Sequence, residues 1–192
     1  TGIKGRVNRG GVLKVEGAEK ETPAEGKFNK GDVIAGVNSK ALKGRNPFVV
    51  LGNAITEAEG TDGLLVFDVE SDGKPKQVSL SIPVLGAYSK TWPVNCPKSK
   101  KIIEQAAAFY SDKTKFKQGG VAGGLMCLFL LSTGEDKYLP RVREYFDGAI
   151  GNPSGIGDHT WDNGYNGIAV CEYYLRTGDK DVLPVIQAYC DN

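Results

Sequence analysis

The chain has 192 residues, a length that suits one domain or two small ones. Its 24 lysine and arginine residues balance 23 aspartate and glutamate residues, and the net charge of +1 argues against a surface built to bind nucleic acid. Apolar residues make up 40% of the chain, which is typical of a folded globular protein, and no uncharged stretch has the roughly 20 apolar residues that span a membrane.

Short apolar or alternating segments near the N-terminus predict a small sheet with one helix. Residues 12–15 and 32–37 have the pattern of short strands. Asn46-Pro47 provides an N-cap and a proline at the first helical position, and this helix is expected to end at Gly60. Four of its apolar residues are spaced to share a face: Phe48, Leu51, Ile55 and Ala58. Two further strands, over 64–69 and 77–82, flank the dipeptide Asp72-Gly73, which is typical of a tight hairpin turn.

The same segment resembles the PDZ domains attached to bacterial secreted and periplasmic proteins. The resemblance covers about residues 1–85 and runs through Thr22-Pro23-Ala24, the stretch Phe28-Asn29-Lys30-Gly31-Asp32-Val33-Ile34, Val37-Asn38-Ser39-Lys40, and Ala54-Ile55 near the helix end. It implies a β-sandwich or barrel with one main helix, and a function in binding peptides or protein segments.

The resemblance also implies where a peptide binds. The peptide would add as an extra strand beside residues 3–7, with its side chains between that strand and the helix. The implied groove residues are Gly2, Ile3, Lys4 and Gly5 from the strand side and Phe48, Gly52 and Ile55 from the helix. The family's carboxylate-binding loop is not present in its usual form, and residues 1–5 are the segment nearest to it. The bound segment could come from a partner or from the same chain.

An alternative interpretation of these residues stays open. Phe48 and Ile55 could belong to the core, in which case no peptide binds. Lys4 and Arg6 could attract a carboxylate, or they could only discourage edge-to-edge association of the sheet.

The composition changes near residue 100, where long apolar stretches at helical spacing replace the short segments. Pro93 and Pro97 restrict the residues before them to extended backbone. We therefore expect a PDZ-like domain over residues 1–87, a linker over 88–99 and helical hairpins over 100–192.

The helical part contains an internal repeat with a period of 44 residues. The matching positions are Gly120 and Gly164, Gly123 and Gly167, Cys127 and Cys171, Leu131 and Leu175, Thr133-Gly134 and Thr177-Gly178, Leu139-Pro140 and Leu183-Pro184, and Tyr145 and Tyr189. Each unit is predicted to contain one helix (121–132 or 165–176), a glycine-capped turn, and a second helix that begins near Lys137 or Asp181. A helix over 98–110 is expected as the second half of an incomplete preceding unit.

Stacked hairpins need neighbours to cover their apolar faces, and two copies are too few, so we expect this chain to be part of a longer polypeptide. The Gly-x-x-Gly starts, residues 173–179 and Leu183-Pro184 resemble the α/α-toroid family shared by terpenoid-cyclase-type folds and many glycan-active enzymes. The expected fold class is therefore α+β, with a PDZ-like sheet followed by the start of a toroid or solenoid. This order of domains resembles a family of large uncharacterised exported bacterial proteins, which implies a periplasmic or extracellular location.

One loop, over residues 155–165, concentrates polar side chains. His159 is the only histidine of the chain, and Asp158 and Asp162 flank it, so these three residues are candidates for acid/base catalysis. Trp161 is a candidate for stacking against a sugar ring. The preceding repeat has Lys115 in place of His159, so the polar set is not required by the hairpin itself. In the alternative interpretation the two aspartates cap backbone amides and Trp161 packs under the loop.

The cysteines and glycines give no sign of a metal or cofactor. No two cysteines have C-x-x-C spacing, which argues against a zinc site. Cys127 and Cys171 occupy equivalent positions in apolar helices, so they are expected as buried free thiols. The glycines at 119–124 follow no strand and precede no Gly-Lys pair, which argues against a phosphate loop.

The residues leave two functions from different classes. The first is a peptide- or protein-binding module joined to toroid hairpins, in a scaffold or substrate-recruiting role. The alternative is the N-terminal part of an exported enzyme, a glycan- or peptide-active hydrolase or lyase, with its site at the toroid mouth.

Overall fold

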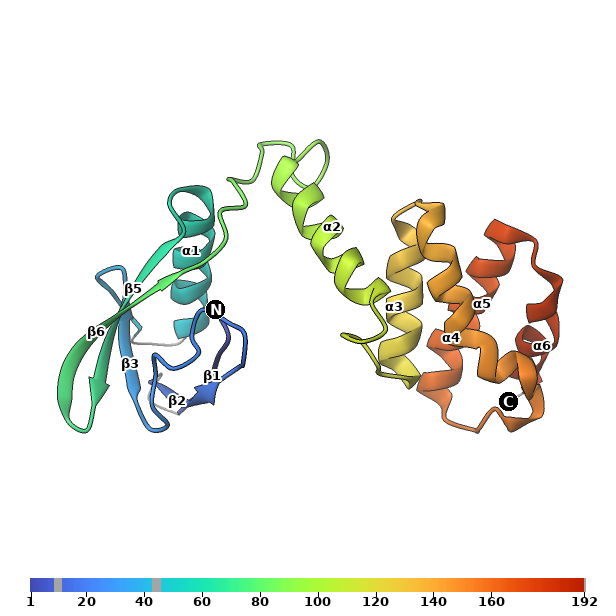
Figure 1. The fold of residues 1–192 in the computed structure, drawn as a ribbon, viewed down its shortest axis with the longest axis horizontal. Coiled ribbons are helices and arrows are strands. Elements are labelled where there is room, and N and C mark those ends of the chain that lie inside the picture. Colours follow the sequence, from blue (N-terminus) through green and yellow to red (C-terminus); the bar gives the residue numbers. More distant parts are fainter. Residues whose placement is uncertain (9–11, 43–45, 192) are drawn as a thin grey trace. The chain divides into compact units, whose positions relative to one another are not determined.

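The computed structural model of the protein describes residues 1–8, 12–42 and 46–191. The chain divides into two compact units, Thr1–Lys101 and Ile102–Asn192, and the division falls inside helix α2 (Pro97–Ser111). The first unit holds an antiparallel sheet and helix α1 (Pro47–Gly60), whereas the second is built from helices (Figure 1). The protein is therefore α+β.

The strands of the first unit form a single antiparallel sheet. They are β1 (Ile3–Val7), β2 (Leu13–Ala18), β3 (Val33–Val37), β4 (Lys40–Ala41), β5 (Leu64–Ser71) and β6 (Lys74–Ser81). Their order is β1-β2-β3-β5-β6, with β4 paired to β3, so β1 and β6 are the edges of the sheet within the described residues. β2 is hydrogen-bonded to β3 through the pairs Leu13–Ile34 and Lys14–Val33, so the strands belong to one sheet.

The β5–β6 hairpin confirms the turn predicted from the Asp-Gly dipeptide. The strands pair without a break from Leu64 and Ser81 to Ser71 and Lys74. Asp72 and Gly73 both have positive φ angles, 51° and 74°, as a two-residue turn matched to the twist of the strands requires.

Helix α1 covers one face of the sheet and contributes to its core. Pro47, Ala54 and Ala58 are buried, and Leu51 is half-buried between them in the helical sequence. Phe48 was expected on this face, but its side chain is 57% exposed. Positions 47, 51, 54 and 58 follow the i, i+4, i+7, i+11 spacing of one helical face, and Phe48 lies a further 100° round the helix.

A buried carboxylate holds the loop before β3 to the β5–β6 hairpin. Asp32 is 3% exposed and accepts hydrogen bonds from Ser71 Oγ at 2.7 Å, Lys76 Nζ at 2.9 Å and the Asn29 amide at 3.0 Å. Burial alone would raise the pKa of this carboxyl group, but these hydrogen bonds and the charge of Lys76 lower it overall. Asp32 is thus a structural anion of the first unit.

The segment expected as a linker over 88–99 makes defined contacts with the end of α1. Just before this segment, the Gly86 amide donates to the Glu59 carbonyl oxygen at 2.8 Å. Lys98 is fully buried, with its Nζ 2.6 Å from Glu59 Oε2 and 4.3 Å from the centre of the Tyr88 ring. A buried ammonium group needs such a partner, so this ion pair fixes the start of α2 to α1.

The second unit contains two helical hairpins in the predicted register. After α2 come α3 (Gly120–Ser132), η1 (Asp136–Tyr138), α4 (Leu139–Gly151), η2 (Pro153–Gly155), α5 (Thr160–Thr177), η3 (Lys180–Val182) and α6 (Leu183–Asp191). The short helices η1 and η3 begin 44 residues apart, as do α4 and α6, which confirms the repeat. Helix α5 begins five residues before its predicted start, with Asp162 in its first turn, where a negative charge is favourable. No described helix has the length and apolar character needed to cross a membrane.

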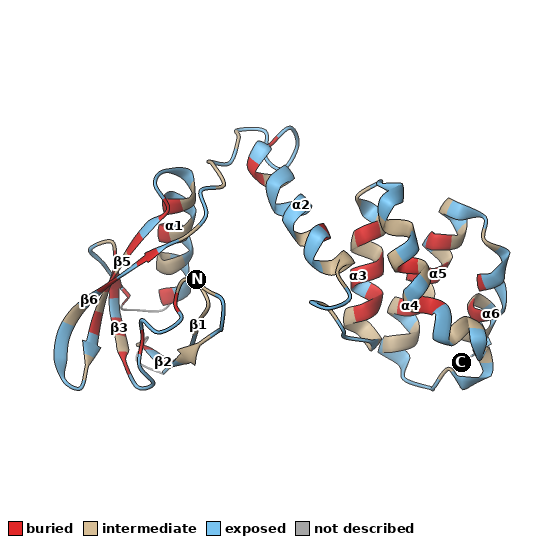
Figure 2. Cartoon of the chain, in the orientation of Figure 1, coloured by how far each residue is buried: buried red, intermediate tan, exposed pale blue. Residues whose placement is uncertain are grey.

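The hairpins pack through a close approach between α3 and α5, which lie side by side in Figure 1. A Cβ atom at Gly124 would lie 2.9 Å from the carbonyl carbon of Tyr165 and 3.0 Å from Asn166 Oδ1. Only glycine fits there without displacing the α5 backbone. The core of this unit includes Cys127, Leu130, Val142, Phe146, Val170 and Val185. Buried segments of its helices are red in Figure 2.

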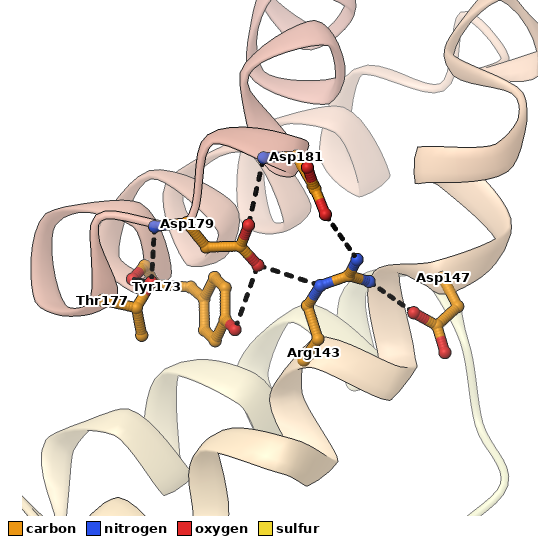
Figure 3. Close-up of polar contacts among 6 residues, drawn as sticks. All are labelled: Arg143, Asp147, Tyr173, Thr177, Asp179 and Asp181. Atoms are coloured by element: carbon orange, nitrogen blue, oxygen red, sulfur yellow. Dashed lines mark hydrogen bonds and ion pairs between the residues drawn. The ribbon is translucent and has the colours of Figure 1, made fainter.

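Two arginines fasten each hairpin to the turn of the other. Arg143 of α4 binds Asp179 through Nε at 2.9 Å and contacts Asp181 at 3.6 Å, and it also pairs with Asp147 on its own helix (Figure 3). Tyr173 donates to the same Asp179 oxygen at 3.3 Å. One guanidinium group thus binds three carboxylates, two of them from the second turn, and holds that turn against α4.

The second arginine, Arg176, belongs to the second hairpin and contacts the turn of the first. Arg176 at the end of α5 donates to the Leu131 carbonyl oxygen at 2.8 Å and binds Asp136 at 2.7 Å. The Leu131 carbonyl oxygen also accepts from the Gly134 amide at 3.1 Å, so Arg176 adds a second donor at the end of α3 and ties that end to α5.

Replacing Gly124 with alanine tests the close approach of the two helices. We expect Gly124→Ala to lower the free energy of unfolding by about 2 kcal/mol, because the added methyl group meets backbone that cannot retreat. Gly164→Ala is the matched control, since Gly164 lies within α5 with no atom within 4 Å of its Cβ position. This control should be neutral or gain up to about 1 kcal/mol from helix propensity. Urea unfolding followed by far-UV circular dichroism measures both, and equal effects would contradict the proposed contact.

Candidate functional site

The polar loop of the second unit borders a hollow of about 330 Å³. One side is formed by small residues: Gly120, Gly148, Ala149, Gly155 and Gly157. The lining also includes the polar side chains Asn152, His159, Asp162, Asn163, Asn166 and Tyr189. Its volume lies at the lower end of the range of small-molecule sites. Two of the predicted catalytic candidates, His159 and Asp162, therefore line one cavity.

Asp162 has a structural contact in addition to its place in the hollow. Its Oδ1 atom accepts a hydrogen bond from the Val121 amide at 3.0 Å. The expected capping role is thus present, but the capped amide belongs to α3 and not to the helix that carries Asp162. Because the two helices are fixed at Gly124, this bond also sets the position of the first turn of α5.

His159 and its neighbours lie on the solvent side of the loop. The His159 carbonyl oxygen accepts from the Asn163 amide at 2.9 Å, which starts α5 and leaves the exposed imidazole at the hollow. Asp158 and Trp161 line a second, more open depression together with His159. Trp161 is 73% exposed, so the interpretation that it packs under the loop is wrong.

The hollow is lined by two residues that were not predicted from the sequence, Asn166 and Tyr189, and Tyr145 contacts Asn166 without lining the hollow itself. Tyr145 Oη lies 3.0 Å from Asn166 Oδ1, and burial raises the pKa of Tyr145 to about 12. Burial, followed by the charge of Asp162, also raises the pKa of Tyr189. Both phenols are therefore neutral at ordinary pH and act as hydrogen-bond donors, not as bases. Two features of the sequence could have pointed to these residues. One is the tyrosine that recurs at positions 145 and 189, and the other is the polar Asn166 among apolar helix positions.

The peptide-binding residues predicted in the first unit lie at the β1 edge of the sheet. In an antiparallel edge strand every second residue turns its N–H and C=O away from its neighbour, so β1 offers free main-chain groups opposite β2. The side chains of Ile3 and Val7 pack against the core. Lys4 is exposed and lies 3.6 Å from Glu19. The outer edge of β1 is thus a main-chain surface bordered by apolar side chains.

Gly2 and Gly5 have packing reasons to be glycine. A Cβ atom at Gly2 would lie 2.0 Å from Thr22 Oγ1, and one at Gly5 would lie 2.7 Å from the Lys14 carbonyl oxygen. These residues are therefore explained by close contacts inside the sheet. They do not by themselves indicate a carboxylate-binding loop.

The helix residues predicted for the same groove differ in exposure. Phe48 and Gly52 are exposed, and the Cβ position of Gly52 has no atom within 4 Å. Ile55 is half-buried and packs against the same core cluster as Ile3 and Val7. The interpretation that places Phe48 in the core is therefore wrong. The same interpretation of Ile55 is confirmed in part, because Ile55 is half-buried against the core. Gly86 and Lys98, which follow the sheet in the chain, contact Glu59 at the C-terminal end of α1. Phe48 lies at the opposite end of that helix.

The cysteines are free thiols in the structure. Cys127 is fully buried, and burial raises its pKa to about 12, whereas its repeat partner Cys171 is only half-buried. Among the residues that the structure describes, no group of three or more histidine, cysteine, aspartate or glutamate side chains is arranged to hold a metal ion.

Comparison with known proteins gives one match. A family model described as a domain of unknown function (DUF6288) matches residues 99–192, which include both helical hairpins. No curated protein and no solved structure matched the chain. The similarity therefore concerns the helical part and leaves its chemistry to be argued from the site.

Substitutions of Asp162 separate its capping role from its charge. Asp162→Ala should lower the free energy of unfolding by about 1 kcal/mol, because the Val121 amide loses its acceptor. Asp162→Asn keeps an oxygen acceptor at the same place, so its stability should stay within about 0.5 kcal/mol of the wild type. Chemical denaturation measures both variants. A stability loss in the asparagine variant as large as in the alanine variant would show that charge, and not capping, is what the fold requires.

Proposed function

We propose that the first unit binds an extended peptide segment as an additional strand on β1, as a recruiting or scaffold module. The observation that carries this proposal is the position of β1 at the edge of the sheet, with Ile3 and Val7 facing the core that α1 covers. An added strand gains main-chain hydrogen bonds along β1, and its alternate side chains fall on the α1 side of the sheet.

The opposite edge of the sheet is less suited to this role. β6 begins with Lys74, Pro75 and Lys76. Proline lacks an N–H donor, and lysines on an edge strand discourage pairing with another chain. Both edges carry basic side chains, but only β6 contains a proline, so pairing with an added strand is interrupted on β6 and not on β1.

Ion pairs across β1 and β2 bear on the kind of segment that binds. Lys4 pairs with Glu19, and Arg6 pairs with Glu16 at 2.8 Å. Because both cations already have carboxylate partners, the proposed recognition depends on the peptide main chain and not on a terminal carboxylate. Selectivity comes from the α1 side, where Phe48 is exposed and Gly52 leaves open space.

A pair of tryptophan substitutions on α1 tests this groove. Heptapeptides selected on phage against the full chain would be titrated by fluorescence anisotropy. Gly52→Trp should weaken their binding at least about tenfold by filling the space beside β1. Asn53→Trp, at the neighbouring exposed position on a different side of the helix, should leave the affinity unchanged. Equal effects of the two substitutions, or selected peptides that bind equally when Val7 is replaced by proline, would contradict the proposal.

A second candidate function is supported by the hollow in the helical unit. We propose that it takes a polyhydroxylated ligand such as a sugar. Its polar lining offers planar amide, carboxylate and imidazole groups from Asn163, Asp162 and His159, which suit hydroxyl groups. Trp161, 73% exposed beside the hollow, provides an aromatic face for the apolar side of a sugar ring.

The two tryptophans of the chain provide a matched test of this candidate. Saturation-transfer NMR with a panel of mono- and oligosaccharides would identify a binding sugar. Trp161→Ala should then reduce its affinity about tenfold or more. Trp92→Ala removes the other exposed tryptophan, which is 59% exposed in the first unit, and should have no effect. A panel without saturation transfer, or an equal loss in both variants, would refute sugar binding at this site.

A further inference from the structure

Helix α5 leaves an apolar stripe exposed to solvent. Ile168 is 54% and Leu175 is 75% exposed, and their separation of seven positions places both on one side of the helix. Trp161 lies a further seven positions before Ile168. Its counterpart in the preceding repeat, Lys117, lies before the start of α3, so the repeat does not show what would cover Trp161. Large apolar side chains in a row on one helix face usually mark a contact surface.

The repeat shows what covers this face in the preceding hairpin. The positions 44 residues before Ile168 and Leu175 are Gly124 and Leu131 of α3. Gly124 is buried against Tyr165 of α5, and the Leu131 carbonyl oxygen accepts from Arg176 at the end of α5. The face of α3 that corresponds to the exposed stripe of α5 is therefore covered by the first helix of the next hairpin.

The repeated cysteines report the same difference. Cys127 is fully buried, and its proximity contributes to the raised pKa values of Tyr145 in its own hairpin and Tyr189 in the next one. Cys171 occupies the equivalent position and is only half-buried. In α3, Cys127 therefore lies near α6, the second helix of the next hairpin. In α5, no described helix of a following hairpin lies over Cys171.

We infer that the face of α5 formed by Ile168, Cys171 and Leu175 is the docking surface for a further hairpin of the same 44-residue kind. The charges specify that hairpin further. Arg176 of the covering helix binds Asp136, but the position equivalent to Asp136 in the next turn is Lys180. The docking hairpin therefore carries a carboxylate where α5 carries Arg176.

A second copy of this chain fits this surface less well. The side of α5 that would cover it is already packed against α3, and its Arg176 would meet Lys180 with a like charge. The other first helix, α3, has Ser132 at the corresponding position and offers no charge at all. A further hairpin with a complementary charge is the occupant that the repeat supports.

The test extends the full chain by a duplicate of its own residues 149–192 and measures the reaction of Cys171 with N-ethylmaleimide. Cys190 and the duplicate's cysteines are replaced by serine. The remaining cysteines are then Cys171 and the buried Cys96 and Cys127, and mass spectrometry follows the labelling of Cys171. The duplicate carries glutamate or arginine at the position that corresponds to Arg176. Each version is made with Lys180 and with Lys180→Asp, which gives four combinations.

The opposite-charge combinations should slow the labelling of Cys171 at least about tenfold relative to the unextended chain, and the like-charge combinations should protect it less. Leu175→Asp in the best combination should restore fast labelling, because it places a charge in the apolar contact. Unprotected Cys171 in all four combinations would overturn the inference. Protection that grows with concentration in the unextended chain would overturn it as well, since a second copy would then be the occupant. Neither outcome depends on the peptide or sugar sites.

Discussion

The helical unit depends on one constraint, the close approach of α3 and α5 at Gly124. Because no side chain separates the two helices there, the backbone of Tyr165 lies directly against α3. That contact brings Asp162 within 3.0 Å of the Val121 amide and places Arg176 at the open end of α3. The polar loop that precedes α5 is held by the same geometry, so the hollow beside His159 is a consequence of helix packing and not of the loop sequence alone.

The first unit shows a different relation between stability and function. Its core is closed by α1 on one face of a single sheet, and Asp32 ties the loop before β3 to the far hairpin. One edge of that sheet is interrupted by Pro75, whereas β1, the other edge within the described residues, contains no proline. Groups that could pair with another strand are a hazard for aggregation unless they have a use, which is why the unprotected edge is the more informative of the two.

The two hairpins are most informative where they differ. The glycines that face the tyrosine of the second helix (Gly123 against Tyr145, Gly167 against Tyr189) and the glycine-capped turn recur because the same packing within the hairpin recurs. His159 replaces Lys115, and Lys180 replaces Asp136, without any change in the helical register. The first difference puts an imidazole at the hollow, and the second changes the charge that a following hairpin would meet. Neither substitution is needed for the hairpin to fold, so each is free to serve binding.

The sequence by itself determined the elements that depend on local interactions. Asp72-Gly73 specified the hairpin turn, Asn46-Pro47 and Gly60 bounded α1, and the 44-residue period specified the hairpins, since turn chemistry and helix limits act within a few residues. Only the tertiary structure decided that Phe48 lies outside the core, that Asp162 caps another helix, and that Asn166, which accepts from Tyr145, lines the hollow. These features arise from contacts between residues distant in the chain, whose geometry is set by how the elements pack and not by the sequence around each residue.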